Sequence, residues 1–309
     1  MLDSHPEITG CEGFEFIVDE VGDDGTPPEM SDYWDFLSTH HIFGSSGLVI
    51  DRSLDYPELV DSFLQQRLEL SGKKQASAMV HWNFARLLHL WPNARFIHLL
   101  RDPRDVAQSV NQMHWYGNVW TGVGKWTDAE REWGLLVPQL RTDQFIEVGF
   151  ADLIADHETQ LNRVCEFLGV RYTEHMLDYA KDTDYAVPDP SKVSQWGRTL
   201  SERDIRLVEG RVGPLLSERG FEPSGLEPIE PRRVERLLLG VDNRLRMWQR
   251  RIQRFGLRLF LERGVARLVP NESYRSSVAL RYNEIERSHR KRSWRSPGRE
   301  FSVTPDRAE

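Results

Sequence analysis

The sequence predicts an α/β protein whose mainly parallel sheet has helices on both faces, followed by a basic helical extension. Strand and helix patterns alternate over residues 1–225, which is typical of βαβ units and a parallel sheet. After residue 226 the pattern changes, because apolar residues recur at helical spacing between many arginines. We therefore expect two parts with different roles.

The individual elements follow from local signals. Helices are predicted where apolar periodicity ends at glycine or proline, and strands where short apolar runs lie between turn residues. The predicted helices are 57–72, 78–91, 103–113, 127–141, 157–168 and one that Ser201 caps. The predicted strands are 95–100 and 144–150. Two turn-rich loops, 22–29 and 186–195, are expected where ligands bind such sheets.

Composition and charge restrict the class of protein. The chain has 309 residues, of which 39% are hydrophobic and 28% charged, as in an ordinary globular protein. Its net charge of −8 is unevenly divided: residues 231–309 hold 20 basic and 9 acidic side chains, and residues 1–230 hold 20 and 39. The acidic body argues against general nucleic-acid binding. The basic tail suggests an anionic partner or contact with the body.

The N-terminus and the cysteines indicate the compartment. Residues 1–8 lack the basic start and apolar run of a signal peptide, and no stretch reaches the roughly 18 apolar residues of a membrane span. Two cysteines, Cys11 and Cys165, cannot form a disulfide framework. Cys165 lies in an apolar helical pattern and is expected to be a buried thiol. We therefore expect a cytoplasmic protein whose membrane contact, if any, is made by the basic tail.

Residues 96–109 have the pattern of a strand, a turn and a helix. The apolar run at 96–100 is the strand. Asp102 suits the N-cap of the helix, Pro103 its first position and Asp105 its first turn, where an acid favours the helix dipole.

This turn also collects phosphate-binding groups. Exposed N–H groups and the positive helix end are expected beside Arg101 and Arg104, which suits an anionic phosphate. Ser109, one turn after Asp105, can donate a hydroxyl hydrogen bond. In the alternative interpretation, the two arginines only pair with Asp102 and Asp105 and the turn is purely structural.

The motif Arg-Asp-Pro-Arg-Asp-Val-Ala-Gln-Ser at 101–109 resembles the 3′-phosphate-binding motif of sulfotransferases that use 3′-phosphoadenosine 5′-phosphosulfate (PAPS). The flanking segments resemble the same family in chain order: residues 91–98, 150–156, 165–169 and 192–200. Phe150 stands where tyrosine is usual. The resemblance covers roughly residues 1–222 and implies a three-layer, P-loop-like sulfotransferase fold.

The resemblance implies a reaction and a binding site. Arg101 and Ser109 would hold the 3′-phosphate, Trp196 would stack on adenine and Arg198 would assist the phosphate. The reaction would transfer a sulfuryl group from PAPS, without a metal, to a hydroxyl or amine of a carbohydrate, lipid or small molecule. A candidate acceptor platform, with core packing as the alternative, is the aromatic cluster of Trp115, Tyr116, Trp120, Trp126 and Trp133.

The resemblance also suggests catalytic side chains. Glu12 is the first candidate for the base, because related enzymes place an acid at this point, and a shift in register would make it Glu15. His40 and His41 are alternatives that are more often simply solvated. Lys74 is a candidate for stabilising the bridging oxygen of the donor, with an ordinary surface lysine as the equal alternative.

The sequence departs from the family at its start. Related enzymes begin with a strand and a loop of the Arg-Ser-Gly-Thr-Thr-Leu type, which holds the 5′-phosphosulfate. Residues 1–8 resemble the segment that follows this loop in the family. Neither a loop of this type nor a kinase-type lysine loop is visible elsewhere in the sequence. Either the true start lies upstream, or the chain is truncated and expected to be poorly stable and inactive. The alternative function is a non-catalytic nucleotide-binding scaffold whose basic tail binds a partner or a membrane.

The tail has its own pattern. Apolar residues at spacings of four and three form a heptad seam over 234–259, and arginines occupy the other faces. Packing of the seam on the core, a homodimer through 234–259 and a basic helix on an anionic membrane are the open interpretations. We divide the chain into a nucleotide-binding domain at 1–225, a helical extension at 226–286 and a polar tail at 287–309 that we expect to be disordered.

Overall fold

The computed structural model of the protein describes residues 1–11, 13–182 and 188–290. Its strands are β1 (Ile8–Cys11), β2 (Gln75–Ala78), β3 (Phe96–Leu100) and β4 (Phe145–Gly149). β1 pairs with β2 and β3 with β4, both in parallel. The registers place Cys11 opposite Ala78 and Leu100 opposite Gly149, so the strands of each pair end at one edge. The α/β class with parallel strands is confirmed, although the described strands form two separate pairs.

Around β1 and β2, the N-terminal helices enclose an aromatic core. These elements are η2 (Phe14–Ile17), α1 (Met30–Thr39), α2 (Phe43–Ser46) and α3 (Tyr56–Ser71), whereas η1 (Leu2–Ser4) packs on β1 outside this core. Phe16, Tyr33 and Phe63 are completely buried there. α3 confirms the helix predicted at 57–72, because Asp55 caps its start and the left-handed Gly72 ends it.

The region before β3 differs from the prediction. A helix was expected at 78–91, but Gln75–Ala78 forms β2 and helical structure is limited to η3 (Phe84–Arg86) and α4 (Leu87–Leu90). Asn83 has a left-handed backbone, and its N–H donates to the carboxylate of Glu132. Pairing with β1 and this turn therefore replace the first turns of the predicted helix.

The helices around β3 and β4 largely follow the sequence signals. They are α5 (Pro103–Gln112), α6 (Val119–Leu136), η4 (Val137–Gln139), α7 (Phe150–Ala155) and α8 (His157–Leu168). α6 begins well before the predicted residue 127 because the side chain of Asn118 accepts a hydrogen bond from Thr121 N–H and caps the helix. Cys165 of α8 is buried, as predicted.

The chain then returns to α5 through short helices. They are η5 (Glu174–Leu177), α9 (Tyr179–Asp182), η6 (Pro190–Lys192), α10 (Trp196–Thr199), α11 (Glu202–Val212) and α12 (Leu215–Glu218). Ser201 caps α11 by accepting a hydrogen bond from Asp204 N–H, as predicted. α11 packs against both α5 and α6.

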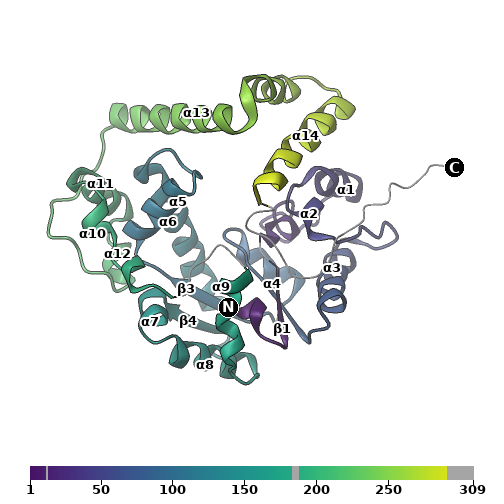
Figure 1. Cartoon of the computed structure of the whole chain (residues 1–309), viewed down its shortest axis with the longest axis horizontal. Coiled ribbons are helices and arrows are strands. Elements are labelled where there is room, and N and C mark those ends of the chain that lie inside the picture. The colour runs from purple at the N-terminus through teal and green to yellow at the C-terminus, as the bar shows by residue number, and fades with distance from the viewer. Residues whose placement is uncertain (12, 183–187, 291–309) are drawn as a thin grey trace.

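Two long helices follow α12. α13 (Arg233–Ala266) spans the upper side of the molecule in Figure 1, and α14 (Glu272–Arg290) turns back to α1. α13 bends at Gly256, whose φ of 77° is left-handed. α14 runs past the predicted boundary at 286; the remaining residues of the predicted tail, 291–309, lie outside the described residues. None of the described helices is long and apolar enough to cross a bilayer.

The predicted heptad seam divides shortly before the bend of α13. Phe255 and Leu259 pack with Val278 of α14 in a small core. Nearer the start of α13 the seam residues are 44–66% exposed: Val234, Leu238, Val241, Leu245 and Trp248. The structure therefore does not place this half of the seam on the core.

Candidate active site

Arg101 lies where the carboxyl ends of β3 and β4 meet. It follows β3 directly, and its guanidinium lies 4.4 Å from the centre of the Phe150 ring, which follows β4. It also donates to the carbonyl of Lys192, at 3.2 Å. Its Nε is buried and has no hydrogen-bond partner among the described residues. Burial lowers the pKa of Arg101, and the nearby Asp105 opposes that shift.

Arg104 has a different environment from Arg101. Asp102 caps α5 by accepting from the N–H of Arg104 at 2.8 Å, as predicted. The Arg104 side chain is buried and pairs with Asp102 and with Glu209, each at 2.7 Å. The structural interpretation of the motif is therefore correct for Arg104, whereas Arg101 keeps an unused donor.

The loop that carries Trp196 closes over the start of α5. Asp105 accepts a hydrogen bond from Trp196 N–H at 2.9 Å, and Gln108 accepts one from the Thr199 hydroxyl at 2.6 Å. Burial raises the pKa of Asp105 even though this bond favours its charged form. The indole Nε1 of Trp196 is buried and has no partner among the described residues.

The remaining predicted binding residues flank this contact. Arg198 of α10 donates to the carbonyl of Ser191 at 3.1 Å. Ser109 is half-buried one turn after Asp105, and its hydroxyl bonds to no described residue. The structure thus brings the start of α5 and α10 into contact, through Asp105 with Trp196 and Gln108 with Thr199.

The unpaired buried N–H donors beside the start of α5 indicate a site for a ligand with acceptor oxygens. A buried donor without an acceptor costs about 1–3 kcal/mol, so buried donors are normally paired. Arg101 Nε and Trp196 Nε1 both lack an acceptor and lie beside a helix N-terminus, where an anion is favoured. These groups fit a phosphate, which offers several acceptor oxygens.

A second polar cluster lies at the carboxyl ends of β1 and β2. Glu15 of η2 is 4% exposed, and its carboxylate contacts His81 Nδ1 at 2.5 Å and accepts from His81 N–H at 3.1 Å. Burial acts to raise the pKa of Glu15, but hydrogen bonds to His81 and to the backbone, together with the electrostatic attraction to His81, outweigh it and lower the pKa. The rings of Trp82 and Trp115 each lie 6.0 Å from the His81 ring. The result is a carboxylate–imidazole pair beside exposed aromatic surface.

A lysine completes this cluster. Lys125 of α6 lies 3.2 Å from the centre of the Trp82 ring. Burial lowers the pKa of Lys125, while the neighbouring carboxylates of Glu15 and Asp19 oppose the shift. Trp82 is held in turn by a 2.8 Å hydrogen bond from its Nε1 to Asp19. A cation therefore lies close to the Glu15–His81 pair.

Comparison with known proteins identifies the family. Residues 1–174 match the sequence model of a family described as "Sulfotransferase family". The chain belongs to this family. The matched region contains Glu15, His81, Arg101 and Ser109, whereas Trp196 and Arg198 lie beyond it.

Similar sulfotransferases are known among curated proteins and solved structures. Over 167 residues the chain is 26% identical to the omega-hydroxy-beta-dihydromenaquinone-9 sulfotransferases Stf3 of Mycobacterium bovis and Mycobacterium tuberculosis, covering 47% of this chain and 40% of each relative. The chain thus spans two fifths of these relatives. The sulfotransferase domain of the Synechococcus PCC 7002 olefin synthase is 18% identical, with a TM-score of 0.48, covering 67% of this chain and 86% of that one. The domain from the curacin biosynthetic pathway is 14% identical, with a TM-score of 0.47, covering 72% and 91%.

The catalytic residues predicted from the sequence lie in different parts of the structure. Glu12 lies outside the described residues. Lys74 is at the amino end of β2, the opposite end from His81, and its 2.7 Å pair with Glu7 raises its pKa. His40 packs beside the rings of Phe16 and Phe36 at the edge of the core, and His41 lies next to it.

The predicted aromatic platform is divided between core and surface. Trp126 and Trp133 are buried in the core, and Trp120 lies beneath the guanidinium of Arg211. Trp115 is 50% exposed beside His81. Only this last residue combines exposure with a position beside the polar cluster.

His81 is the functional candidate that sequence reasoning missed. Its signal was its position just after a strand in a parallel pair, where ligands bind. The signal was hidden because residues 78–91, which include His81, were predicted to form a helix.

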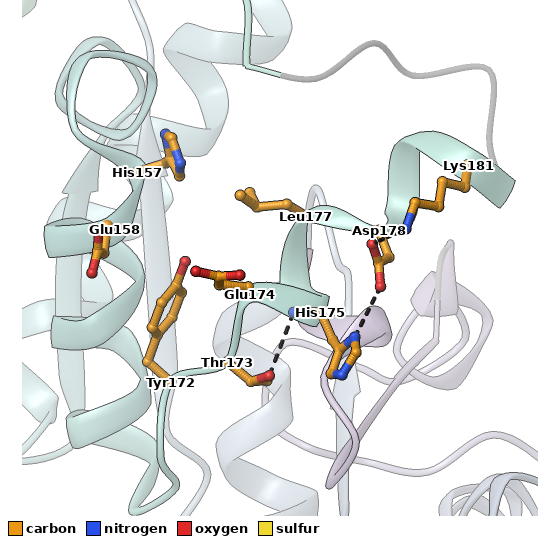
Figure 2. A pocket seen from close by; sticks show the side chains of 9 residues that line it. All are labelled: His157, Glu158, Tyr172, Thr173, Glu174, His175, Leu177, Asp178 and Lys181. Carbon is orange, nitrogen blue, oxygen red and sulfur yellow. Dashed lines mark hydrogen bonds and ion pairs between the residues drawn. The ribbon is translucent and has the colours of Figure 1, made fainter.

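A shallow polar groove lies elsewhere, between α8 and η5 (Figure 2). Its lining includes His157, Tyr172 and His175, and His175 Nδ1 lies 3.0 Å from Asp178. None of the predicted site residues lines it. Within the described part of the chain, no group of three or more potential ligands is arranged to hold a metal ion.

Proposed function

We propose that the protein transfers a sulfuryl group from PAPS to an acceptor hydroxyl or amine. The observation that carries this proposal is the pair of unused buried donors, Arg101 Nε and Trp196 Nε1, at the N-terminus of α5. Membership of the sulfotransferase family supports the same reaction. The 3′-phosphate of the donor is the anion that would satisfy both groups.

Four residues have roles in donor binding under this proposal. Arg101 and Ser109 bind the 3′-phosphate, and Arg198 contributes charge from the closing loop. Trp196 donates its indole N–H to the nucleotide. The guanidinium of Arg104 already lies 3.7 Å from the Trp196 ring centre, so adenine would stack on the other face of the indole.

The Glu15–His81 pair supplies acid–base chemistry. The acceptor oxygen forms a bond to sulfur, while the bond from sulfur to the bridging oxygen of the donor breaks and that oxygen keeps the electron pair. His81 Nε2 takes the acceptor proton, since Glu15 occupies Nδ1 and orients the ring. Lys125 opposes the negative charge that develops. The roles predicted from the sequence, Glu12 as the base and Lys74 at the bridging oxygen, stay predictions and are alternatives to His81 and Lys125.

The acceptor that best fits the surroundings of His81 is a hydroxyl on an apolar molecule. Trp82 and Trp115 are 36% and 50% exposed, and Met79, two residues before His81, is 49% exposed. Large exposed apolar side chains of this kind mark a binding surface. The curated relatives are named for a hydroxylated menaquinone, which supports a lipid-like acceptor over a carbohydrate.

Calorimetry tests the donor assignment. We expect adenosine 3′,5′-bisphosphate to bind at least roughly tenfold more tightly than adenosine 5′-monophosphate, because charged hydrogen bonds contribute about 1.5–3 kcal/mol. Equal affinity for the two nucleotides would contradict the site.

A transfer assay with radiolabelled donor tests the base. His81→Gln should lower the turnover roughly a hundredfold or more and leave affinity for adenosine 3′,5′-bisphosphate unchanged. His175→Gln, which alters an exposed histidine in the groove of Figure 2, is the matched control. Unchanged turnover in His81→Gln would remove His81 from the mechanism. Nucleotide binding without any transfer by the wild type would instead support the scaffold alternative.

A further inference from the structure

The first half of α13 turns its apolar side away from the body. The exposed apolar ridge, as we call it, consists of Val234, Leu237, Leu238, Val241, Leu245 and Trp248, all 44–70% exposed. At about 100° per residue these side chains cover an arc of roughly 100° on one face of the helix. Apolar surface of this extent on the outside of a folded domain marks an interaction site.

Polar contacts hold the opposite side of α13 to the body. The side-chain amide of Asn118 donates to Leu239 O and to Asp242, both at 2.9 Å. Asn243 accepts from the N–H of Gly117 at 2.6 Å, and Arg250 donates to Tyr116 O, also at 2.6 Å. The helix is therefore fixed in one orientation, and the apolar ridge faces outward as a consequence.

Positive charge borders the apolar ridge. Arg233, Arg244 and Arg251 lie on the helix face directly beside it, by the same angular spacing. All three are exposed, and none forms an ion pair within the described part of the chain. Between residues 233 and 255 there are seven arginines and two acids. The face thus combines apolar side chains with uncompensated cations.

The apolar surface continues beyond the bend at Gly256. The rings of Trp248 and Phe260 approach to 6.2 Å across it. Leu257 and Leu261, one turn apart, are 56% and 55% exposed. Both halves of α13 therefore present apolar side chains to the outside.

We propose that α13 docks on an anionic membrane surface, with the apolar ridge among the acyl chains and the bordering arginines at the headgroups. An interfacial helix has this combination of an apolar face and basic flanks. The contact would hold the described part of the chain at the surface of a bilayer.

Charge favours a membrane over a second copy of the chain. A symmetric pair of α13 helices would bring these arginines close to those of the partner, and like charges across such a seam are unfavourable. The two acids of the segment are already used: Glu235 accepts from Arg232 N–H, and Asp242 pairs with Arg246 at 2.7 Å. Anionic lipid supplies the missing negative charge.

Vesicle flotation of the full chain tests the proposal. The probes are vesicles of phosphatidylcholine alone and of phosphatidylcholine mixed with phosphatidylglycerol. We expect binding to the mixed vesicles only, weakened by salt. Arg244→Gln combined with Arg251→Gln should weaken it roughly thirtyfold, given the contribution of each basic residue near such a surface.

Matched variants separate this face from the rest of the surface. Leu238→Ser should lower binding to the mixed vesicles, whereas Leu135→Ser, at a 74% exposed leucine of α6, should not. Arg131→Gln combined with Arg203→Gln, two exposed arginines off α13, is the control for charge. Absence of binding to the mixed vesicles would overturn the proposal, as would equal losses in the α13 and control variants. A dimer in light scattering that Leu238→Ser abolishes would also overturn it, because a second copy would then cover the ridge.

Discussion

Replacing Arg104 should unfold the nucleotide site, whereas replacing Arg101 should leave the fold intact. The two arginines are three residues apart in one motif, but only Arg104 is held by two carboxylates. Its side chain is 3% exposed, and those of Asp102 and Glu209 are 12% and 2% exposed. Arg104→Ala would leave both carboxylates buried without their cation.

The magnitude follows from this burial. Removing one partner of a buried ion pair costs about 3–5 kcal/mol, a large part of a typical folding stability of about 5–15 kcal/mol. For a chain of 309 residues, the melting temperature should fall by roughly 5–10 °C. Arg101→Ala loses one ring contact and one hydrogen bond, so its cost should be only about 1–2 kcal/mol.

Thermal and urea unfolding of both variants measures the difference. Glu209→Gln, alone and combined with Arg104→Ala, completes a cycle in which the two changes should couple by about 0.5–3 kcal/mol. Equal stability losses in Arg104→Ala and Arg101→Ala would refute the division of roles. A coupling near zero would refute the Arg104–Glu209 contact itself.

Three further predictions concern stability. Because the pKa of Glu15 is lowered in the folded protein, its pair with His81 stabilises the fold above the unfolded carboxyl pKa of about 4.3, and this stabilisation is lost as the pH falls from there through the lower folded pKa. Between about pH 5 and 3, the urea midpoint should therefore decline less in Glu15→Gln than in the wild type. An identical decline of the midpoint in both proteins would contradict this. Gly256→Ala should destabilise α13 by about 1 kcal/mol, because the φ of Gly256 is 77°. Gly240 has open space around it, so Gly240→Ala should stabilise α13 by about as much. Melting temperatures that change in the same direction in both variants would be inconsistent with the bend. Asn118→Ala should cost about 1 kcal/mol through loss of the α6 cap and should also release α13, so limited proteolysis near residue 240 should become faster. The control is Asn162→Ala, because the Asn162 side chain bonds only to the Glu158 carbonyl within α8. Equal cleavage rates in the two variants would argue against the attachment.

The start of α5 could be predicted because its signals are local. Asp102 and Pro103 specify a helix N-terminus in any context, and the structure confirms both positions. The neighbouring segment at Gln75–Ala78 could not be recognised, because its small and polar side chains have no apolar run. Pairing with β1 makes it a strand.

Contacts between residues far apart in the chain could not be predicted from the sequence. Glu15 and His81 meet across 66 positions, and nothing local marks their approach. The seam of α13 was visible in the sequence, but its orientation depends on Asn118 and Tyr116, more than a hundred residues earlier. The division between Arg101 and Arg104 likewise depends on Glu209.

A thermodynamic cycle of nucleotide binding tests the central claim most directly. Calorimetry would measure adenosine 3′,5′-bisphosphate and adenosine 5′-monophosphate against the wild type and against Arg101→Ala, with Arg203→Ala as the control. If Arg101 binds the 3′-phosphate, the preference for the bisphosphate should shrink by roughly tenfold or more in Arg101→Ala and stay intact in Arg203→Ala. An unchanged preference in Arg101→Ala would show that the phosphate binds elsewhere and would contradict the assignment.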